Sequence, residues 1–239
     1  MAEAIRAGRG AGCHGHHHDL YQGTERFFRP NYIGNLLSSW IPALDGVEEK
    51  LRAGAKLADV GCGYAASTII MAQEYPNSTF FGFDYHEGSA AGAQRAATEA
   101  GIDDRCSFEV ASAKGYLGSS AYDRVAFFDS LHDMGDPVGV AAHMLDTLKP
   151  DGTWMVEPFA NDRLEDNLTP VERIYYSAST VPYVPASKDQ EVGLALRVQA
   201  GEGRLREVVM GGGFSRFRRA PETPFNRVFE ACPCYSKQS

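Results

Sequence analysis

Two aspartates, Asp59 and Asp84, each end a short apolar run, and a glycine-rich turn follows the first of them. The turn leads directly into the amphipathic start of a helix. Backbone N–H groups at such a helix N-terminus can face a bound ligand, and glycines let the chain pass close to it. We therefore expect a cofactor site at this turn, formed by Gly61, Cys62 and Gly63.

The charge of Asp59 bears on which cofactor binds at the turn. Gly61-x-Gly63-x-x-Ala66 also fits the dinucleotide fingerprint. A pyrophosphate placed there would be repelled by a carboxylate at the strand end. S-adenosylmethionine instead carries positive charge on its sulfonium and amino groups, so Asp59 can lie near the ammonium of its methionine part. We favour S-adenosylmethionine and keep a nicotinamide or flavin cofactor as the alternative.

Asp84 lies about twenty residues beyond the turn, at the end of the second apolar run. An acid at this place accepts hydrogen bonds from the two ribose hydroxyls of a nucleoside cofactor. Tyr85 beside it can lie along the adenine face. Both cofactor classes require such an acid, and the alternative is that Asp84 caps the helix beginning near Gly88.

Composition excludes several classes of protein. The chain has 239 residues, of which 44% are hydrophobic, and this suits one α/β core. Its net charge of −8 argues against a nucleic-acid surface. It contains neither an apolar run of about 20 residues nor a signal-peptide core, and its five cysteines suggest a reducing compartment. We expect a cytoplasmic protein without a membrane partner.

The histidine-rich run at 13–18 is read as a flexible tail without a metal site, since zinc needs ligands fixed by a folded scaffold.

From residue 57 onward, strand-like apolar runs alternate with helical patterns. Such alternation predicts a parallel sheet with helices on both faces. Strands are expected at 57–61, 79–84, 106–110, 123–129 and 153–157, and helices at 66–75, 88–100 and 137–148.

The pattern changes after the fifth predicted strand. Residues 158–200 are polar and are expected to be irregular, and a helix is expected near 202–210. Two final strands, at 214–219 and 225–231, would close the sheet. A five-strand parallel unit closed by a β pair is the layout of class I methyltransferases. We therefore expect an α/β, Rossmann-like fold with a mainly parallel seven-stranded sheet.

The segment before the sheet is expected to be partly helical. Residues 1–28 show no clear period, whereas 31–40 and 44–52 have helical patterns separated by a proline. We divide the chain into an N-terminal tail and helical lid segment, 1–55, and an S-adenosylmethionine-binding domain, 56–239.

The loop after the fourth predicted strand faces the ligand, because open α/β sheets bind ligands beyond the carboxyl ends of their strands. His132 in this loop can take a proton from a hydroxyl near neutral pH, with Asp133 or Asp129 orienting the imidazole. Asp129, at the strand end, is also expected to contact the cofactor. The alternative is that His132 and Asp133 hydrogen-bond the start of the next helix.

Five segments of the chain together resemble a family of bacterial class I methyltransferases that usually carries an N-terminal winged-helix domain. The loop 131–136 also resembles the His-Asp-Trp loop of small-molecule O-methyltransferases, in which the histidine is the general base. The resemblance implies S-adenosylmethionine as cofactor and a small-molecule acceptor, and it places Ser112 and Ala113 at the adenine edge. The five segments are Gly23–Pro30, Trp40–Val47, Asp59–Gly63, Phe128–Pro137 and Glu157–Asn167.

Three departures of this chain from the family leave two hypotheses about its function open. The chain begins after the place where a winged-helix part would end, Ala65 stands where glycine is more usual, and 153–157 is one residue shorter. The first hypothesis is a methyltransferase that acts on a hydroxyl oxygen with His132 as general base. The second is a non-catalytic S-adenosylmethionine-binding module that serves as a sensor or an assembly subunit. The acceptor and a homodimeric state stay open.

Aromatic residues gather just before the sheet, at Phe27, Phe28 and Tyr32, and they are too many for an exposed linker. We expect this segment to fold over the cofactor site as a lid, with Tyr175 and Tyr176 completing a wall of the acceptor pocket. The alternative is that the aromatics pack on the outer helices of the sheet.

Overall fold

The computed structural model describes residues 3, 6–157, 161–197 and 200–233. Within these ranges, seven strands form one sheet in the order β3-β2-β1-β4-β5-β7-β6. The strands β1 to β5 run parallel, whereas β7 pairs antiparallel with both β5 and β6. The mainly parallel sheet expected from the sequence is confirmed. Its strands are β1 (Lys56–Val60), β2 (Thr79–Asp84), β3 (Cys106–Val110), β4 (Tyr122–Phe128), β5 (Leu148–Glu157), β6 (Arg216–Glu222) and β7 (Arg227–Cys232).

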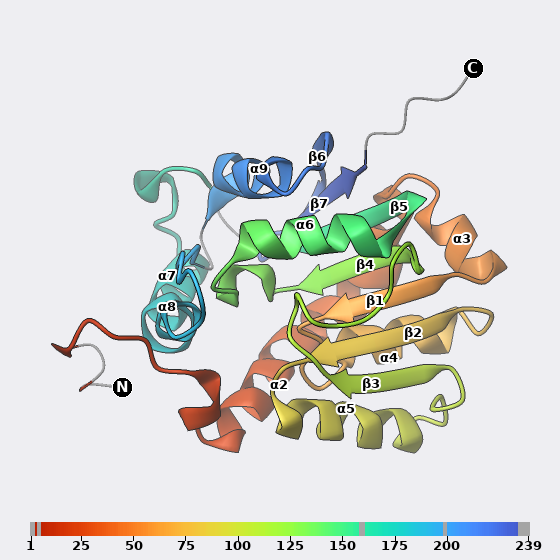
Figure 1. Cartoon of the computed structure of the whole chain (residues 1–239), viewed down its shortest axis with the longest axis horizontal. Helices are drawn as coiled ribbons and strands as arrows, with labels where there is room; N and C mark the ends of the chain where they lie inside the picture. Colours follow the sequence, from red (N-terminus) through yellow and green to blue (C-terminus); the bar gives the residue numbers. More distant parts are fainter. Residues whose placement is uncertain (1–2, 4–5, 158–160, 198–199, 234–239) are drawn as a thin grey trace.

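Helices cover both faces of the sheet, and each face has its own hydrophobic cluster (Figure 1). Leu57 of β1 belongs to the cluster beneath α4 and α5, whereas its neighbour Ala58 belongs to the cluster beneath α6 and α9. Successive residues of a strand point to opposite faces, so a strand buried on both sides reads as a continuous apolar run. The helices are α2 (His18–Asn35), α3 (Val47–Ala53), α4 (Ala66–Glu74), α5 (Glu87–Glu99), α6 (Pro137–Thr147), α7 (Pro170–Ala178), α8 (Val184–Lys188) and α9 (Gly201–Gly211).

The N-terminal segment departs from the sequence-based expectation. A helix was expected to begin at Asn31 after a flexible tail, but α2 begins at His18, where the His17 side chain accepts a hydrogen bond from the backbone N–H of Asp19. Phe28 and Tyr32 of α2 are buried in the cluster that also covers β1. Burial of these rings against the sheet stabilises the helix, since most of a helix's stability in a protein comes from tertiary packing.

The segment after β5 was expected to be irregular, and this prediction was wrong. It contains α7 and α8, joined by a π-helical turn at Ser179–Tyr183. Thr169 and Glu172 form a capping box, and Pro170 occupies the first turn of α7. This helix-start signature is visible in the sequence and could have predicted α7.

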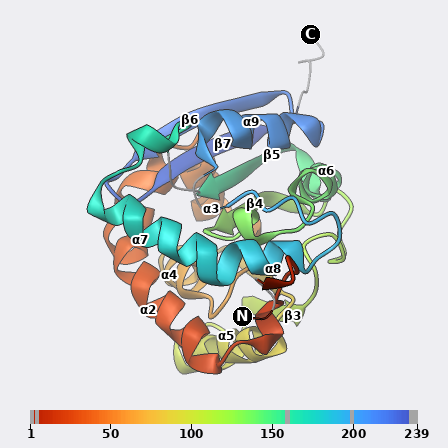
Figure 2. The same cartoon turned by 90° about the vertical axis from the view of Figure 1, so that its left-hand side faces the viewer.

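The helices α2 and α7 cross the carboxyl-terminal edge of the parallel strands (Figures 1 and 2). They contact each other through aromatic rings, since the ring centroids of Phe28 and Tyr175 lie 6.5 Å apart. These two helices therefore stand where an open α/β sheet places its ligands. No helix in the described ranges is long and apolar enough to span a bilayer.

Candidate active site

A cavity of about 580 Å³ opens at the carboxyl ends of β1, β2 and β4, within the size range of about 300–1,000 Å³ usual for small-molecule sites. Strand ends form its floor, and residues of α2 and of the segment around α8 form its cover. Two of the predicted site residues, Asp59 and His132, do not line it. The predicted residues that do are Gly61, Cys62, Gly63, Asp84, Tyr85, Ser112, Ala113, Asp129 and Asp133.

The turn after β1 requires glycine for two different reasons. Gly61 has a φ of +75°, and a Cβ there would lie 2.6 Å from Cβ of Ser130. Gly63 has a φ of +54°, and a Cβ there would meet no atom within 4 Å, so a ligand can approach the backbone closely. Ala65 also adopts a left-handed conformation, which favours glycine over a residue with a Cβ atom.

Asp59 lies beneath this turn and is fully buried. Its Oδ2 accepts hydrogen bonds from Ser67 Oγ at 3.0 Å and from Thr68 Oγ1 at 2.5 Å. Burial raises the pKa of this carboxyl to about 6, although the two hydroxyl groups oppose the shift. Asp59 thus connects the end of β1 to the first turn of α4. Because Asp59 does not line the cavity, its charge can act on a bound ammonium group only through the residues of the cavity wall.

Asp84 lines the cavity, and two backbone N–H groups hold its carboxyl group in place. The backbone N–H of Gly63 donates to its Oδ2 at 2.9 Å, and the N–H of His86 donates to its Oδ1 at 2.8 Å. A carboxylate has about four acceptor positions, so two remain for ligand hydroxyls. Burial raises the pKa of Asp84, whereas the two backbone donors oppose that rise.

The residue that caps the helix after β2 is His86, not Asp84 as the alternative reading of the sequence expected. The side chain of His86 accepts from the N–H of Ser89 at 3.1 Å at the start of α5. Asp84 is therefore free of the helix start and keeps its place in the cavity wall.

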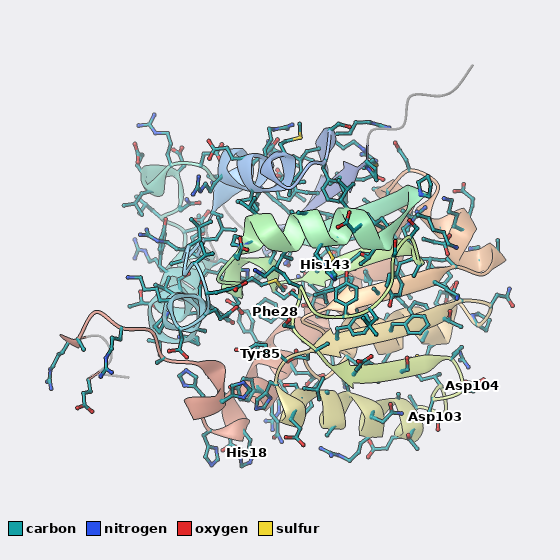
Figure 3. All side chains as sticks on the ribbon, viewed as in Figure 1. His18, Phe28, Tyr85, Asp103, Asp104 and His143 are labelled. Carbon is teal, nitrogen blue, oxygen red and sulfur yellow. The ribbon has the colours of Figure 1, made fainter. Side chains whose placement is uncertain are left out.

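Aromatic rings surround the end of the cavity nearest β2. Tyr85 lines this end and is 38% exposed, and the ring of His14 meets its ring edge-on at a centroid distance of 5.1 Å. Tyr21 stacks on His86 at 4.3 Å. The histidine-rich segment, expected to be a flexible tail, is therefore packed against the loop after β2. Figure 3 shows Tyr85 at the edge of the sheet that faces the N-terminal helix.

The N-terminal helix also contacts the end of β4. The hydroxyl of Tyr32 donates to Asp129 Oδ2 at 3.0 Å, and both residues line the cavity. Phe28 lies one helical turn earlier on the same face and lines the cavity as well. A contact between residues nearly one hundred positions apart leaves no local trace in the sequence.

The proposed wall of the acceptor pocket is corrected by the structure. Tyr175 and Tyr176 do not line the cavity, and Tyr175 instead packs behind it against Phe27 and Phe28. Pro182 and Tyr183, in the π-helical turn after α7, take that place.

His132 and Asp133 form the short 3-10 turn Leu131–Asp133 after β4. His132 Nε2 lies 3.3 Å from Asp133 Oδ1, and the imidazole meets the ring of Tyr183 edge-on at 5.1 Å. Burial lowers the pKa of His132 to about 3. The pKa of Asp133 is raised well above its usual value by burial and by the neighbouring carboxylates of Asp129 and Asp84.

Comparison with known proteins agrees with this geometry. A family described as a methyltransferase domain matches residues 51–194. The chain belongs to this methyltransferase family. No curated protein sequence matches it.

Solved structures show the same fold as this methyltransferase domain. An O-methyltransferase family protein from Burkholderia thailandensis aligns with a TM-score of 0.66 and 15% identity, over 90% of this chain and 58% of its own. The mitomycin 7-O-methyltransferase MmcR aligns with a TM-score of 0.60 and 18% identity, over 81% of this chain and 52% of MmcR. The magnesium protoporphyrin IX methyltransferase ChlM from Synechocystis PCC 6803, with bound SAH, aligns with a TM-score of 0.54 and 20% identity. The alignment covers 78% of this chain and 77% of ChlM. This methyltransferase chain thus spans little more than half the length of the first two.

Proposed function

We propose that this chain transfers the methyl group of S-adenosylmethionine to a hydroxyl oxygen of a small molecule. One observation carries the proposal: a single cavity joins the glycine turn, the Asp84 carboxylate and Asp133 of the His132–Asp133 pair. The family match supports methyl transfer, and MmcR and the Burkholderia protein, both named as O-methyltransferases, support oxygen as the methylated atom.

The residues present fit S-adenosylmethionine in both charge and shape. Asp84 offers free acceptor positions at the tip of β2, where a ribose would bind, and Tyr85, Ser112 and Ala113 border the place for adenine. Asp129 and the turn at Gly61–Gly63 border the place for the methionine part, whose ammonium and sulfonium are cationic. Carboxylates from separate strands favour a cationic ligand over a pyrophosphate.

When bound, S-adenosylmethionine supplies an electrophilic methyl group. The chain's own part is to hold an acceptor hydroxyl in line with that methyl group and to receive the hydroxyl proton. The His132–Asp133 pair is the proton-accepting unit of this proposal. The cover formed by α2 and the turn around Tyr183 excludes water from it.

Calorimetry with S-adenosylmethionine and S-adenosylhomocysteine, followed by a homocysteine-release assay on a panel of phenols and alcohols, tests the function. We expect both nucleosides to bind and at least one hydroxyl compound to be methylated. Binding without turnover across hydroxyl, amine and thiol panels would instead favour a non-catalytic binding module. Absence of binding would contradict both hypotheses.

The cover of the cavity gives a second testable expectation. We expect Tyr21→Ala to weaken S-adenosylhomocysteine binding by up to about tenfold, because the ring that stacks on His86 beside the nucleoside end is lost. Calorimetry on the folded variant measures the effect. Ile33→Ala is the control, since Ile33 lies on the same helix, is 65% exposed and does not line the cavity. Equal affinities in the two variants would contradict a role of α2 as a lid.

A further inference from the structure

The two members of the His132–Asp133 pair differ in their access to the cavity. Asp133 lines it and 29% of its side chain is exposed, whereas His132 does not line it and is 2% exposed. Neighbouring residues of a 3-10 turn project about 120° apart, so both cannot face the same ligand. In this chain the carboxyl group of Asp133 faces the cavity, and the imidazole of His132 lies behind it.

Two contacts hold this arrangement in place. The His132 ring lies edge-on against Tyr183, and its Nε2 faces Asp133 Oδ1 at 3.3 Å. Within the described part of the chain, neither ring nitrogen of His132 makes a hydrogen bond, so the contact of Nε2 with Asp133 Oδ1 is its only close polar contact there. The polar route from the cavity to the imidazole therefore passes through the Asp133 carboxyl group.

The backbone of Asp133 is fixed as well, by a residue far away in the sequence. Gln190 Nε2 donates to the Asp133 carbonyl at 2.9 Å, and the N–H of Gly135 donates to Gln190 Oε1 at 3.0 Å. One amide side chain thus clamps both sides of the loop. The direction of the Asp133 side chain is set by this clamp and by the His132 contact.

We propose that Asp133 receives the proton of the acceptor hydroxyl, and that His132 is a positioning residue that holds the Asp133 carboxyl group from behind. This inference rests on the proposed function. As the acceptor oxygen forms its bond to the methyl group, the sulfonium carbon–sulfur bond breaks with its electron pair going to sulfur. The acceptor O–H bond breaks, and its proton goes to Asp133 Oδ. The products are a methyl ether, S-adenosylhomocysteine and the protonated Asp133.

The surroundings of Asp133 suit a proton acceptor. A carboxyl group whose pKa is raised well above its usual value by burial and by neighbouring carboxylates is a stronger base than an ordinary exposed one. Other charged and titratable groups also line the cavity or contact its lining. Asp129 lies beside the Tyr32 hydroxyl, Asp84 beside two backbone N–H groups, Glu25 beside Arg29, Lys114 beside Asp136 and Glu191, and the Tyr183 ring against His132. The remaining titratable lining residues are His16, Tyr21, Cys62, Tyr64, Tyr85 and His86.

Two substitutions separate the roles of the pair. Asp133→Asn keeps the shape but cannot take the proton, and His132→Gln keeps an amide nitrogen near the place of Nε2. With a hydroxyl acceptor from the screen, we expect Asp133→Asn to lower kcat by about 100-fold and to abolish the acidic limb of the pH profile. We expect His132→Gln to lower kcat less than tenfold and to shift that limb without removing it. Asp133→Glu should restore part of the activity.

The opposite pattern, with His132→Gln losing about 100-fold and Asp133→Asn nearly unchanged, would overturn the assignment. Affinity for S-adenosylhomocysteine, measured by calorimetry, should stay within about threefold in both variants. The exposed Asp103→Asn serves as the control for loss of a carboxylate.

A second measurement needs no acceptor and so separates this inference from the proposed function. Diethyl pyrocarbonate, followed by peptide mapping of the S-adenosylhomocysteine-loaded protein, should modify His18, whose side chain is 65% exposed, and spare His132. Modification of His132 at the rate of His18 would show that the imidazole faces the cavity, and would overturn the inference whatever the acceptor.

Discussion

Asp84→Asn is expected to weaken S-adenosylhomocysteine binding by roughly 100-fold. The variant keeps the size of the side chain but replaces a charged acceptor by a neutral amide at the place where the ribose hydroxyls would bind. Hydrogen bonds to a charged group contribute about 1.5–3 kcal/mol, and about 1.4 kcal/mol corresponds to a factor of ten. Isothermal titration calorimetry at pH 8 gives the affinity directly.

The same carboxyl group predicts how affinity depends on pH. Because burial raises the pKa of Asp84, the ionised form that binds ribose is lost as the pH falls through this raised value. Wild-type affinity should therefore decline as the pH falls through the raised pKa of Asp84, and this decline should be smaller in Asp84→Asn.

Asp103→Asn is the matched control for Asp84→Asn. Asp103 is exposed at the opposite side of the molecule from Tyr85 (Figure 3). Its substitution removes the same charge and should leave affinity unchanged. Equal affinities in wild type and Asp84→Asn, with both proteins folded, would contradict the nucleoside site.

Asp59→Asn is expected to raise the free energy of unfolding at pH 7 by up to about 3 kcal/mol. The pKa of Asp59 rises from 3.8 to about 6 on burial, and each unit corresponds to about 1.36 kcal/mol. The ionised carboxylate is thus less stable in the folded protein than in the unfolded chain. Asparagine keeps an oxygen that can accept the hydroxyl bonds of Ser67 and Thr68 and carries no charge.

The gain in stability from Asp59→Asn depends on pH, because Asp59 takes up its proton at a higher pH in the folded protein than in the unfolded chain. Above pH 6 Asp59 is ionised in both states, so the gain from asparagine is complete. Between pH 6 and 4 the folded wild type binds a proton that the unfolded chain does not, so the gain shrinks, and below pH 4 it vanishes. Urea unfolding of both proteins at pH 7.5 and pH 4 measures the difference.

A gain of equal size at both pH values would show that charge burial is not its cause. Because Asp59 lies beneath the turn rather than in the cavity wall, Asp59→Asn should reduce S-adenosylhomocysteine affinity less than Asp84→Asn does. A larger loss in Asp59→Asn would place the Asp59 carboxylate in direct contact with the ligand.

The strand–turn–helix units of this protein were predictable from the sequence because their signals are local. The strands β1 to β4 lie within one residue of their expected bounds, β5 begins five residues earlier than expected, and α4, α5 and α6 begin where expected to within one residue. The left-handed glycines at 61 and 63 and the acid at 84 follow a spacing set by one βαβ unit. The glycine turn and the acid at 84 could therefore be placed at the cavity before any tertiary contact was known.

The cover of the site was decided by the tertiary structure. The burial of Phe28 and Tyr32 of α2 depends on a sheet that follows this helix in the chain. The hydrogen bond from Tyr32 to Asp129 and the clamp of Gln190 on Asp133 join segments far apart in sequence. No short-range pattern encodes such contacts.

The same reason explains why the sequence alone did not separate the positions of His132 and Asp133. The sequence placed both His132 and Asp133 in the loop after β4, and it favoured the histidine because an ordinary imidazole titrates near neutral pH. Which side chain faces the cavity depends on how the 3-10 turn is rotated. That rotation is set by packing of the imidazole against Tyr183 and by the hydrogen bonds of Gln190, so only the folded chain separates a buried histidine from the aspartate that lines the cavity.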